Sequence, residues 1–366
     1  MSKEIVGIRG CFLVCGTAVW LGAFAAAQDS PRTLQDLKPI GRLQGDEVQR
    51  EAELLRVANI RPVTREAITT LTAAFGDESD LVRQSALRSI AALGAEARAA
   101  APALLTLALE RQKPAWLRSR TLSVLATIGG CSPEAVADLV GLGQDGGESL
   151  LVRISAVTSL GDFTLLGDEQ RRSVAAAVTP LLRRIAREDP SALLRAKVWE
   201  CLAKCDPADP EAIRSLLEVS KGRLGAVAVV IEGPLSTSFD VSAEAIRTMI
   251  RIGRTEEVTP ILMSKLEGMA EERATAAFIL SEMGPSAKSA VPALVKALER
   301  DDEAPDEVAV KTMVLRALVR IAPDSKLVIS AIEGVKSRSS NERVRDLADR
   351  SLQHARNAVP RENAKP

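Results

Sequence analysis

One short line of residues recurs along the chain and constrains its fold more than any other feature. In the clearest copy, residues 82–94 are V-R-Q-S-A-L-R-S-I-A-A-L-G. Most copies have an apolar residue followed by a basic one, then a small residue and further apolar residues at helical spacing. The basic position, or the residue in its place, falls at Arg83, Arg118, Arg153, Arg195, Ser242, Arg273, Lys311 and Arg345. The steps between these positions range from 31 to 47 residues, which is the period of a helical repeat array.

The apolar positions of each copy share one face of a helix, because they are three and four residues apart. The small residue lets a neighbouring helix approach, and the final glycine, where present, suits a left-handed helix stop. Apolar segments with an early proline lie between copies, at 101–104, 179–182, 259–262 and 291–294. Proline is tolerated in the first turn of a helix. Each unit is therefore predicted to be a helix, a turn and a second helix that begins near a proline.

These residues resemble a known class of repeat. The line V-R-x-x-A-L, together with A-V-P-A-L at residues 290–294, is similar to HEAT-like repeats, in particular the short bacterial variety also found in phycobilisome lyases. The resemblance covers roughly residues 45–355. It implies an all-α fold, an alpha-alpha superhelix of about eight to nine helix pairs, and is almost silent on activity. The fifth copy departs from the pattern, because Ser242 replaces the basic residue.

Composition agrees with a helical array and excludes several kinds of chemistry. The chain is 46% hydrophobic but only 2% aromatic, so its apolar content is aliphatic and can be buried between stacked helices. Its one histidine, His354, cannot build a multi-histidine metal centre or zinc site, and a lone histidine near the C-terminus disfavours a Ser-His-Asp triad. Equal numbers of basic and acidic residues, 48 of each, disfavour nucleic acid as a partner. We therefore expect no metal, no small-molecule cofactor and no catalysis.

The N-terminus has the features of an export signal. Lys3 and Arg9 precede an uncharged run at residues 11–27, which ends in small residues suited to signal peptidase. We expect cleavage between Ala27 and Gln28 and a periplasmic or extracellular location. The alternative is an uncleaved membrane anchor, although the run is slightly shorter than the 20 or so apolar residues of a typical span. Contact with a membrane is expected only in that case.

The mature chain is predicted to have one repeat domain with polar ends. Residues 28–44 are expected to be a polar linker, 45–356 the solenoid, and 357–366 a disordered tail. Within the solenoid, the spacer 221–240 contains a β-branched run at 227–231. We interpret the spacer as a packed irregular loop. The alternative is a functional, strand-like insertion, because long loops on rigid scaffolds often bind ligands.

One group of arginines is a candidate for a binding site, and a pair of cysteines has to be weighed beside it. Arg172, Arg183 and Arg187 lie on one side of the helix expected at 168–188, and such a stripe can bind carboxylates or phosphates through charge-assisted pairs. The alternative to a binding stripe is an ordinary solvent-exposed polar face of the helix. Cys201 and Cys205 lie one helical turn apart, which does not suit a disulfide. They are expected to be small buried residues, and Cys131 suggests no pairing either.

The function expected from these features is binding. An array of helix pairs offers an extended concave face to a protein or peptide, and no catalytic constellation accompanies it. We therefore expect an exported, non-enzymatic scaffold that binds protein or peptide partners along the concave face. The alternative, implied by the resemblance, is a lyase-like or accessory enzyme factor of the phycobilisome-lyase repeat type. HEAT-like hydroxylases resembling the deoxyhypusine enzyme need paired His-Glu iron ligands that this sequence does not have.

Overall fold

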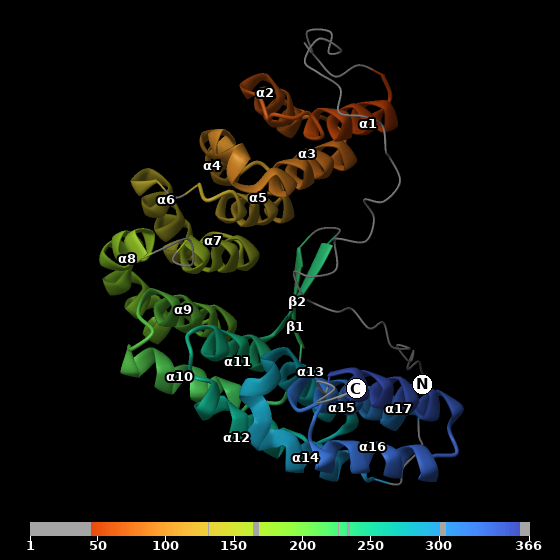
Figure 1. Ribbon diagram of the computed structural model, residues 1–366. Coiled ribbons are helices and arrows are strands. Elements are labelled where there is room, and N and C mark those ends of the chain that lie inside the picture. Colours follow the sequence, from red (N-terminus) through yellow and green to blue (C-terminus); the bar gives the residue numbers. More distant parts are fainter. Residues whose placement is uncertain are drawn as a thin grey trace, which may run out of the picture.

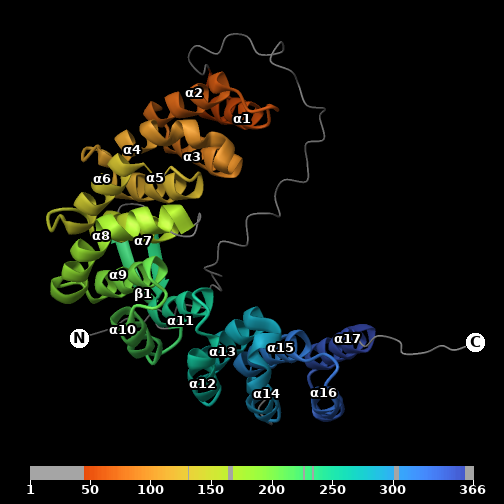
Figure 2. The same cartoon turned by 60° about the vertical axis from the view of Figure 1, so that its left-hand side comes forward.

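The computed structural model describes residues 45–130, 132–163, 168–225, 227–232, 235–300 and 305–358. In these ranges the chain is a curved double layer of antiparallel helices (Figures 1 and 2).

The odd-numbered helices line the inner side of the curve: α1 (Glu47–Ala58), α3 (Asp80–Leu93), α5 (Ala115–Thr127), α7 (Leu150–Phe163), α9 (Ala192–Cys205), α11 (Val241–Arg251), α13 (Ala270–Met283), α15 (Pro305–Ile321) and α17 (Glu342–Ala358). The even-numbered helices form the outer layer: α2 (Arg65–Ala73), α4 (Ala101–Leu109), α6 (Pro133–Gln144), α8 (Asp168–Glu188), α10 (Pro210–Ser220), α12 (Thr255–Lys265), α14 (Val291–Leu298) and α16 (Lys326–Arg338). The fold is thus an all-α superhelix of the HEAT-like kind, with α17 as a last unpaired helix.

The two layers differ in how completely they are buried. Each inner helix packs against the inner helices before and after it, as α7 does against α5 and α9. As a result α7 and α9 have buried residues on almost every side. The outer helix α10 is amphipathic instead: it buries Ala212 and Leu216, while Arg214 and Glu218 are exposed. A helix with buried residues on almost every side lies in an interior, as α7 and α9 do between their neighbours.

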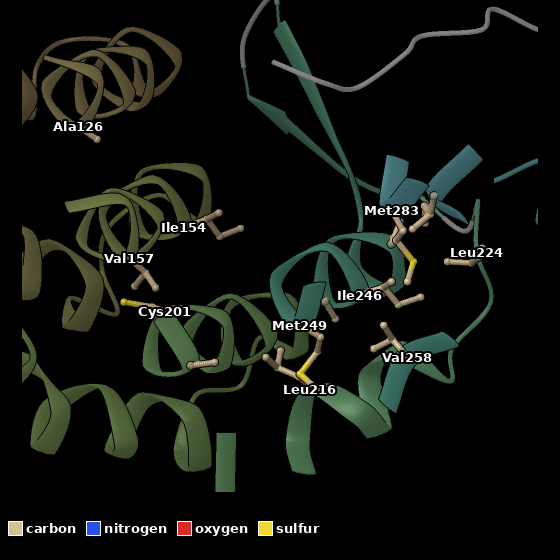
Figure 3. Close-up of a cluster of buried hydrophobic side chains, with 14 of the residues drawn as sticks. Ala126, Ile154, Val157, Cys201, Leu216, Leu224, Ile246, Met249, Val258 and Met283 are labelled. Carbon is tan, nitrogen blue, oxygen red and sulfur yellow. The ribbon is translucent and has the colours of Figure 1, made fainter. Parts of the chain in front are cut away.

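The interior is continuous from one end of the described array to the other. Figure 3 shows one section of it, where Leu216 of α10, Ile246 and Met249 of α11 and Val258 of α12 meet. All four of these side chains are fully buried. The small residue of the repeat, such as Ala86 or Ala276, is also fully buried, as expected for a position where helices approach closely. The predicted role of the apolar stripe in stacking is confirmed.

The glycine that ends the repeat line has two different roles. Gly94 and Gly284 follow α3 and α13 with a positive φ of 55° and 58°, but their ψ of −133° and −137° lies outside the left-handed helical region, so they end the helix in a different conformation from the one predicted. Gly161 differs, because it lies inside α7 and is buried against α9. A Cβ atom built there would lie 3.3 Å from the Cα atom of Cys201. At this position glycine serves close helix packing, and the prediction of a helix stop is wrong.

The prolines of the outer helices also fall into two groups. Pro102 and Pro292 stand in the first turn of α4 and α14, as predicted. Pro180 and Pro260 lie inside α8 and α12, because those helices begin well before their prolines. Both interior prolines are exposed, so the carbonyl that loses its helical partner can be solvated. The prediction that a proline starts the outer helix therefore holds for α4 and α14, and also for α6 and α10, which begin at Pro133 and Pro210, but not for α8 and α12.

The spacer between α10 and α11 contains a β-hairpin, not the irregular loop that the sequence suggested. Strand β1 (Val227–Glu232) pairs antiparallel with β2 (Leu235–Asp240), with Val227 opposite Asp240. The β-branched run lies in β1, where such side chains fit a pleated surface. The hairpin lies on the inner side of the curve, with β1 against α7 and β2 against α11 (Figure 1).

One stretch, Asp80–Leu109, has the length and hydropathy of a membrane span. In the structure this stretch is α3, the 3-10 segment η3 (Gly94–Ala100) and α4, and the chain reverses at Gly94. It is therefore two antiparallel members of the array. The expected signal peptide, the linker, Cys131 and the tail from 359 onward lie outside the described residues.

Gly161 offers a test of the close contact between α7 and α9. We expect Gly161→Val to lower the free energy of unfolding by about 1–3 kcal/mol, because the side chain overpacks the contact with Cys201. Gly141→Val is the matched control, since Gly141 is an exposed helical residue of α6 with no neighbouring atom within 4 Å of a Cβ. Urea denaturation followed by circular dichroism measures both. Equal stability of the two variants would contradict the packing role.

Candidate binding surface

Stacking leaves each inner helix only one open side, and three positions of the repeat occupy it. They are counted from the residue that opens each copy of the repeat line, which is Val310 on α15. Residues three, six and ten positions later face the open side, and on α15 these are Met313, Arg316 and Arg320. Equivalent positions on neighbouring helices lie side by side: Lys204 Nζ of α9 is 2.9 Å from Asp162 Oδ1 of α7, both at the tenth position. These positions therefore form rows along the inner face, which we call the inner rows.

In the middle of the array the inner rows contain a buried cluster of charges. Lys197, Glu200 and Lys204 follow one another along α9, and each is less than a tenth exposed. Lys197 Nζ lies 3.1 Å from Glu200 Oε1, and it also pairs with Glu244 of α11. The cluster is thus neutralised by carboxylates from three helices, because Asp162 of α7 pairs with Lys204.

The hairpin contributes to this burial. The ring of Phe239 in β2 lies 5.5 Å from Lys197 Nζ, a cation–π contact. Burial lowers the pKa of Lys197, while the charge of Glu200 and its hydrogen bond oppose the shift. The contacts of Lys197 thus join α9, α11 and the hairpin at the centre of the inner face.

Toward the C-terminus the inner rows change character. Arg251 of α11, Arg316 and Arg320 of α15 and Arg350 of α17 are all exposed. Within the described ranges none of the four has an ion pair or a hydrogen bond. We call these four residues the inner arginine row. Since the whole chain has no net charge, this row is a local concentration of positive charge on a neutral protein.

An aromatic side chain lies within this basic surface. Phe278 occupies the sixth position on α13 and is half-buried, and the guanidinium carbon of Arg316 lies 5.9 Å from the centre of its ring. Next to it, Arg247 Nε of α11 pairs with Glu282 Oε2 of α13 at 3.3 Å. The surface can therefore offer both guanidinium groups and an apolar contact to a ligand.

The arginines singled out in the sequence lie elsewhere. Arg172, Arg183 and Arg187 are on α8, in the outer layer, and not on the inner face (Figure 1). Arg183 reaches Asp209 Oδ2 at 2.5 Å and Glu211 Oε2 at 2.6 Å, both in the segment that starts α10. Arg187 reaches the same Glu211 carboxylate at 2.8 Å, and this hydrogen bond is the main cause that lowers the pKa of Glu211. Arg183 and Arg187 thus join α8 to the next unit. The binding of a partner by all three arginines stays a prediction.

The arginine of the repeat line has a structural role that the sequence did not reveal. Arg118 donates from Nε to the carbonyl oxygen of Ala108 at 2.7 Å, and its two terminal nitrogens hold Glu148 at 2.9 and 2.6 Å. Ala108 ends the outer helix before α5, and Glu148 precedes α7, the next inner helix. Arg153 repeats the arrangement with the carbonyl of Gly143 and the carboxylate of Asp189. Arg273 pairs with Glu307 in the first turn of α15, the next inner helix, but its Nε donates to no carbonyl in the described part of the chain.

These pairs form what we call the inter-repeat ladder. Its members are buried, with side-chain exposures of 3% and 5% for Arg118 and Glu148. The signal for the ladder is present in the sequence as an acidic residue three to five positions before an opening apolar residue. Only the alignment of one unit with the next reveals the pairing, because the partners are 30–36 residues apart.

The cysteines behave as packing residues. Cys201 and Cys205 are buried and form no disulfide. A hydrogen bond with Cys205 and burial raise the pKa of Cys201 well above its ordinary value, so the thiol is not ionised at neutral pH. Within the described ranges no group of three or more histidine, cysteine, aspartate and glutamate residues is arranged to hold a metal ion.

Comparisons with known proteins give likeness of architecture. No protein-family model matches the chain, and no curated protein matches it by sequence. The structure of human deoxyhypusine hydroxylase with glycerol is 18% identical, covers 87% of this chain and 100% of its own, and has a TM-score of 0.33. The E. coli protein YibA is 13% identical with coverages of 87% and 100% and a TM-score of 0.44. The complex of CpcE and CpcF of phycocyanin lyase from Nostoc sp. PCC7120 is 17% identical with coverages of 74% and 94% and a TM-score of 0.37.

The ladder is tested by removing one cation. We expect Arg118→Met to destabilise the protein by about 3–5 kcal/mol, because Glu148 is left buried without its partner. Lys221→Met removes an exposed pair with Glu218 and should change stability by less than about 1 kcal/mol. Chemical denaturation measures both, and similar losses in the two variants would contradict the structural role.

The same pair predicts a pH dependence. Burial by itself raises the pKa of Glu148, but the hydrogen bonds from Arg118 and from the backbone N–H of Ser149 outweigh it, so the folded-state pKa is lowered. The stabilisation is therefore complete above the ordinary glutamate pKa and is lost as pH falls through the lowered value. We expect the melting temperature of Arg118→Met to depend less on pH in this acid range than that of the unmodified protein.

Proposed function

We propose that this protein is a non-enzymatic scaffold that binds an acidic segment of a partner protein along its inner face. The observation that carries the proposal is the inner arginine row, Arg251, Arg316, Arg320 and Arg350. These guanidinium groups are exposed on three inner helices and have no carboxylate partner within the described part of the chain. Elsewhere on the inner rows, charges such as Lys204 and Arg247 are paired inside the protein.

The geometry of the row favours an extended ligand. Its members lie on α11, α15 and α17, so a ligand that reaches all four must run along several repeats. Guanidinium groups bind carboxylates through two parallel hydrogen bonds, which suits aspartate and glutamate side chains. A single exposed ion pair contributes only about 0–1 kcal/mol, so useful affinity needs several pairs at once. Phe278, between Arg247 and Arg316 in the sixth-position row, adds an apolar contact for a side chain of the ligand.

A protein ligand fits this surface better than nucleic acid. The chain as a whole carries no net charge, and only 2% of its residues are aromatic, so it has neither a broad basic footprint nor a stacking platform. The four arginines are instead a local patch matched to a short acidic segment. The absence of a chemical step is part of the proposal and is supported by the single histidine of the sequence.

Export is the second part of the proposal. The basic start, the uncharged run at 11–27 and the small residues before Gln28 support a cleaved signal, so the scaffold would act outside the cytoplasm. N-terminal sequencing of the protein purified from its native cells should show a chain that begins at Gln28. A chain that retains residues 1–27 would instead support an array anchored to the membrane.

The binding proposal is tested with a fluorescently labelled peptide rich in aspartate and glutamate. We expect the protein to bind it with an affinity that falls as salt rises, because exposed charges are screened. Removing two of the four arginines, as Arg316→Gln with Arg320→Gln, should weaken binding about tenfold, since each exposed pair contributes up to about 1 kcal/mol. Fluorescence anisotropy measures the dissociation constants.

The control variant removes the same number of positive charges from the outer layer. Arg65 of α2 and Arg214 of α10 are exposed, and Arg65→Gln with Arg214→Gln should leave the affinity unchanged. Equal weakening by the two double variants would contradict a specific inner surface. Tighter binding of a single-stranded oligonucleotide than of the acidic peptide would contradict the choice of partner.

A further inference from the structure

The inner layer changes direction between α11 and α13. Figure 2 shows that the helices up to α10 stack along one line and that those from α12 onward stack along another. Among the pairs of consecutive inner helices in the described ranges, α11 and α13 share the smallest contact. The ion pair between Arg247 Nε and Glu282 Oε2, at 3.3 Å, joins these two helices, and both of its side chains are partly exposed. The array therefore has a weakly packed joint at this place.

The inter-repeat ladder is incomplete on α11. Ser242 stands at the basic position there, where the other seven copies have arginine or lysine. Its hydroxyl donates to the carbonyl oxygen of Val219 in α10 at 3.1 Å, as Arg118 donates to that of Ala108. Arg118 also reaches forward to Glu148, whereas a serine side chain is short and has a single donor. Ser242 thus ties α11 back to α10 and not forward to α13.

Lys265 makes the forward connection from the outer layer. It is the last residue of α12 and is only 7% exposed. Its Nζ lies 3.0 Å from Glu272 Oε1 of α13 and donates to the carbonyl oxygens of Lys221 and Gly222, directly after α10. Lys265 therefore joins the end of one outer helix to the next inner helix, which is what Arg118 does in an earlier unit.

The sections on either side of this joint are tied within themselves. Glu244 of α11 pairs with Lys197 of α9, and the hairpin contacts both α7 and α11. On the other side, α13 packs closely against α15, and Arg273 pairs with Glu307 between them. We call α1–α11 the first arm and α13–α17 the second arm.

The cation at the joint suits a moving contact. A guanidinium group that grips a carboxylate with two parallel hydrogen bonds, as Arg118 grips Glu148, fixes the direction of approach. The ammonium group of a lysine is instead a compact charge on a flexible stem, so it keeps its partner over a range of orientations. We propose that the two arms rotate relative to each other between α11 and α13, with Lys265 as the pivot that holds them together.

The joint crosses the inner arginine row. Arg251 lies on α11 in the first arm, and Arg316, Arg320 and Arg350 lie on α15 and α17 in the second arm. The angle between the arms therefore sets the distance from Arg251 to the other three guanidinium groups. The hinge itself is independent of the acidic-segment proposal, and only its effect on a ligand rests on that proposed function.

Distances between spin labels test the hinge. The labels are attached at Thr127→Cys on α5 and Gln353→Cys on α17, both exposed, in the full chain with all cysteines except the buried Cys201 and Cys205 replaced by serine. We expect Lys265→Met to shift or broaden the distance distribution by about 5 Å. This corresponds to a rotation of about 10° of an arm about 30 Å long, at about 8–10 Å between stacked helices. Double electron–electron resonance measures the distribution.

Two controls separate a hinge from general loosening. Lys296→Met removes an exposed pair with Glu267 and should leave the distribution unchanged. A label pair within the first arm, Asn59→Cys with Thr127→Cys, should be unaffected by Lys265→Met. Circular dichroism shows that each variant is folded.

A milder variant probes the same joint. Arg247→Gln removes the partly exposed pair with Glu282 and should also broaden the distribution across the joint, to a smaller extent. An unchanged distribution in both Lys265→Met and Arg247→Gln would overturn the proposal, and so would equal broadening within the first arm.

Peptide binding supplies a second readout. Lys265 lies outside the inner arginine row, yet Lys265→Met should weaken binding of the acidic peptide severalfold, because the row is no longer held at one spacing. Failure of the unmodified protein to bind the peptide would contradict the acidic-segment proposal alone. The distances across the joint test the hinge without any ligand.

Discussion

A helix pair of this size cannot cover its own apolar stripe, and that constraint organises the whole molecule. Each inner helix is covered by an outer helix of its own unit and by the inner helices on either side, so burial is shared between units. The interior is consequently one long core that runs through all the described units. Ligands must be held on faces that stacking does not use, which limits the binding surface to the open side of each layer and to the joints between units.

Charges follow the same division. At the joints, arginines such as Arg118 and Arg153 tie the end of one outer helix to the loop ahead of the next inner helix, and these pairs are buried. In the middle of the inner face, Lys197 and Lys204 are neutralised by nearby carboxylates. Toward the C-terminus the arginines of the inner rows are exposed and unpaired within the described ranges. A chain with no net charge can therefore present a locally basic surface.

Much of the fold could be predicted from the sequence, since the spacing of apolar and small residues specifies which face of each helix is buried. The positive φ of Gly94 and Gly284 and the burial of Ala86 follow from the same pattern. The hairpin could not be identified with certainty, because a short β-branched run fits both a strand and a packed loop. The interior positions of Pro180 and Pro260 depend on where those helices begin, and helix starts are poorly defined by propensity alone.

The candidate site was harder to predict for a different reason. Along a single helix Arg183 and Arg187 look like an open stripe, but their partners Asp209 and Glu211 come from the next unit. The inner arginine row shows the converse, because its members are spread over three helices and become a surface only when the repeats are aligned with one another. In a stacked array the partner of a charged side chain lies about one repeat further along the sequence. The pattern of residues within one helix therefore does not show which charged side chains form ion pairs.

The hairpin between α10 and α11 has a consequence for the shape of any occupant of the inner face. Strands β1 and β2 stand on the inner side against α7 and α11, halfway along the array (Figure 1). A rounded domain that filled the curve would collide with these strands, whereas a slender unfolded polypeptide could pass beside them. For the acidic segment proposed above, this placement favours a narrow, extended polypeptide over a folded domain.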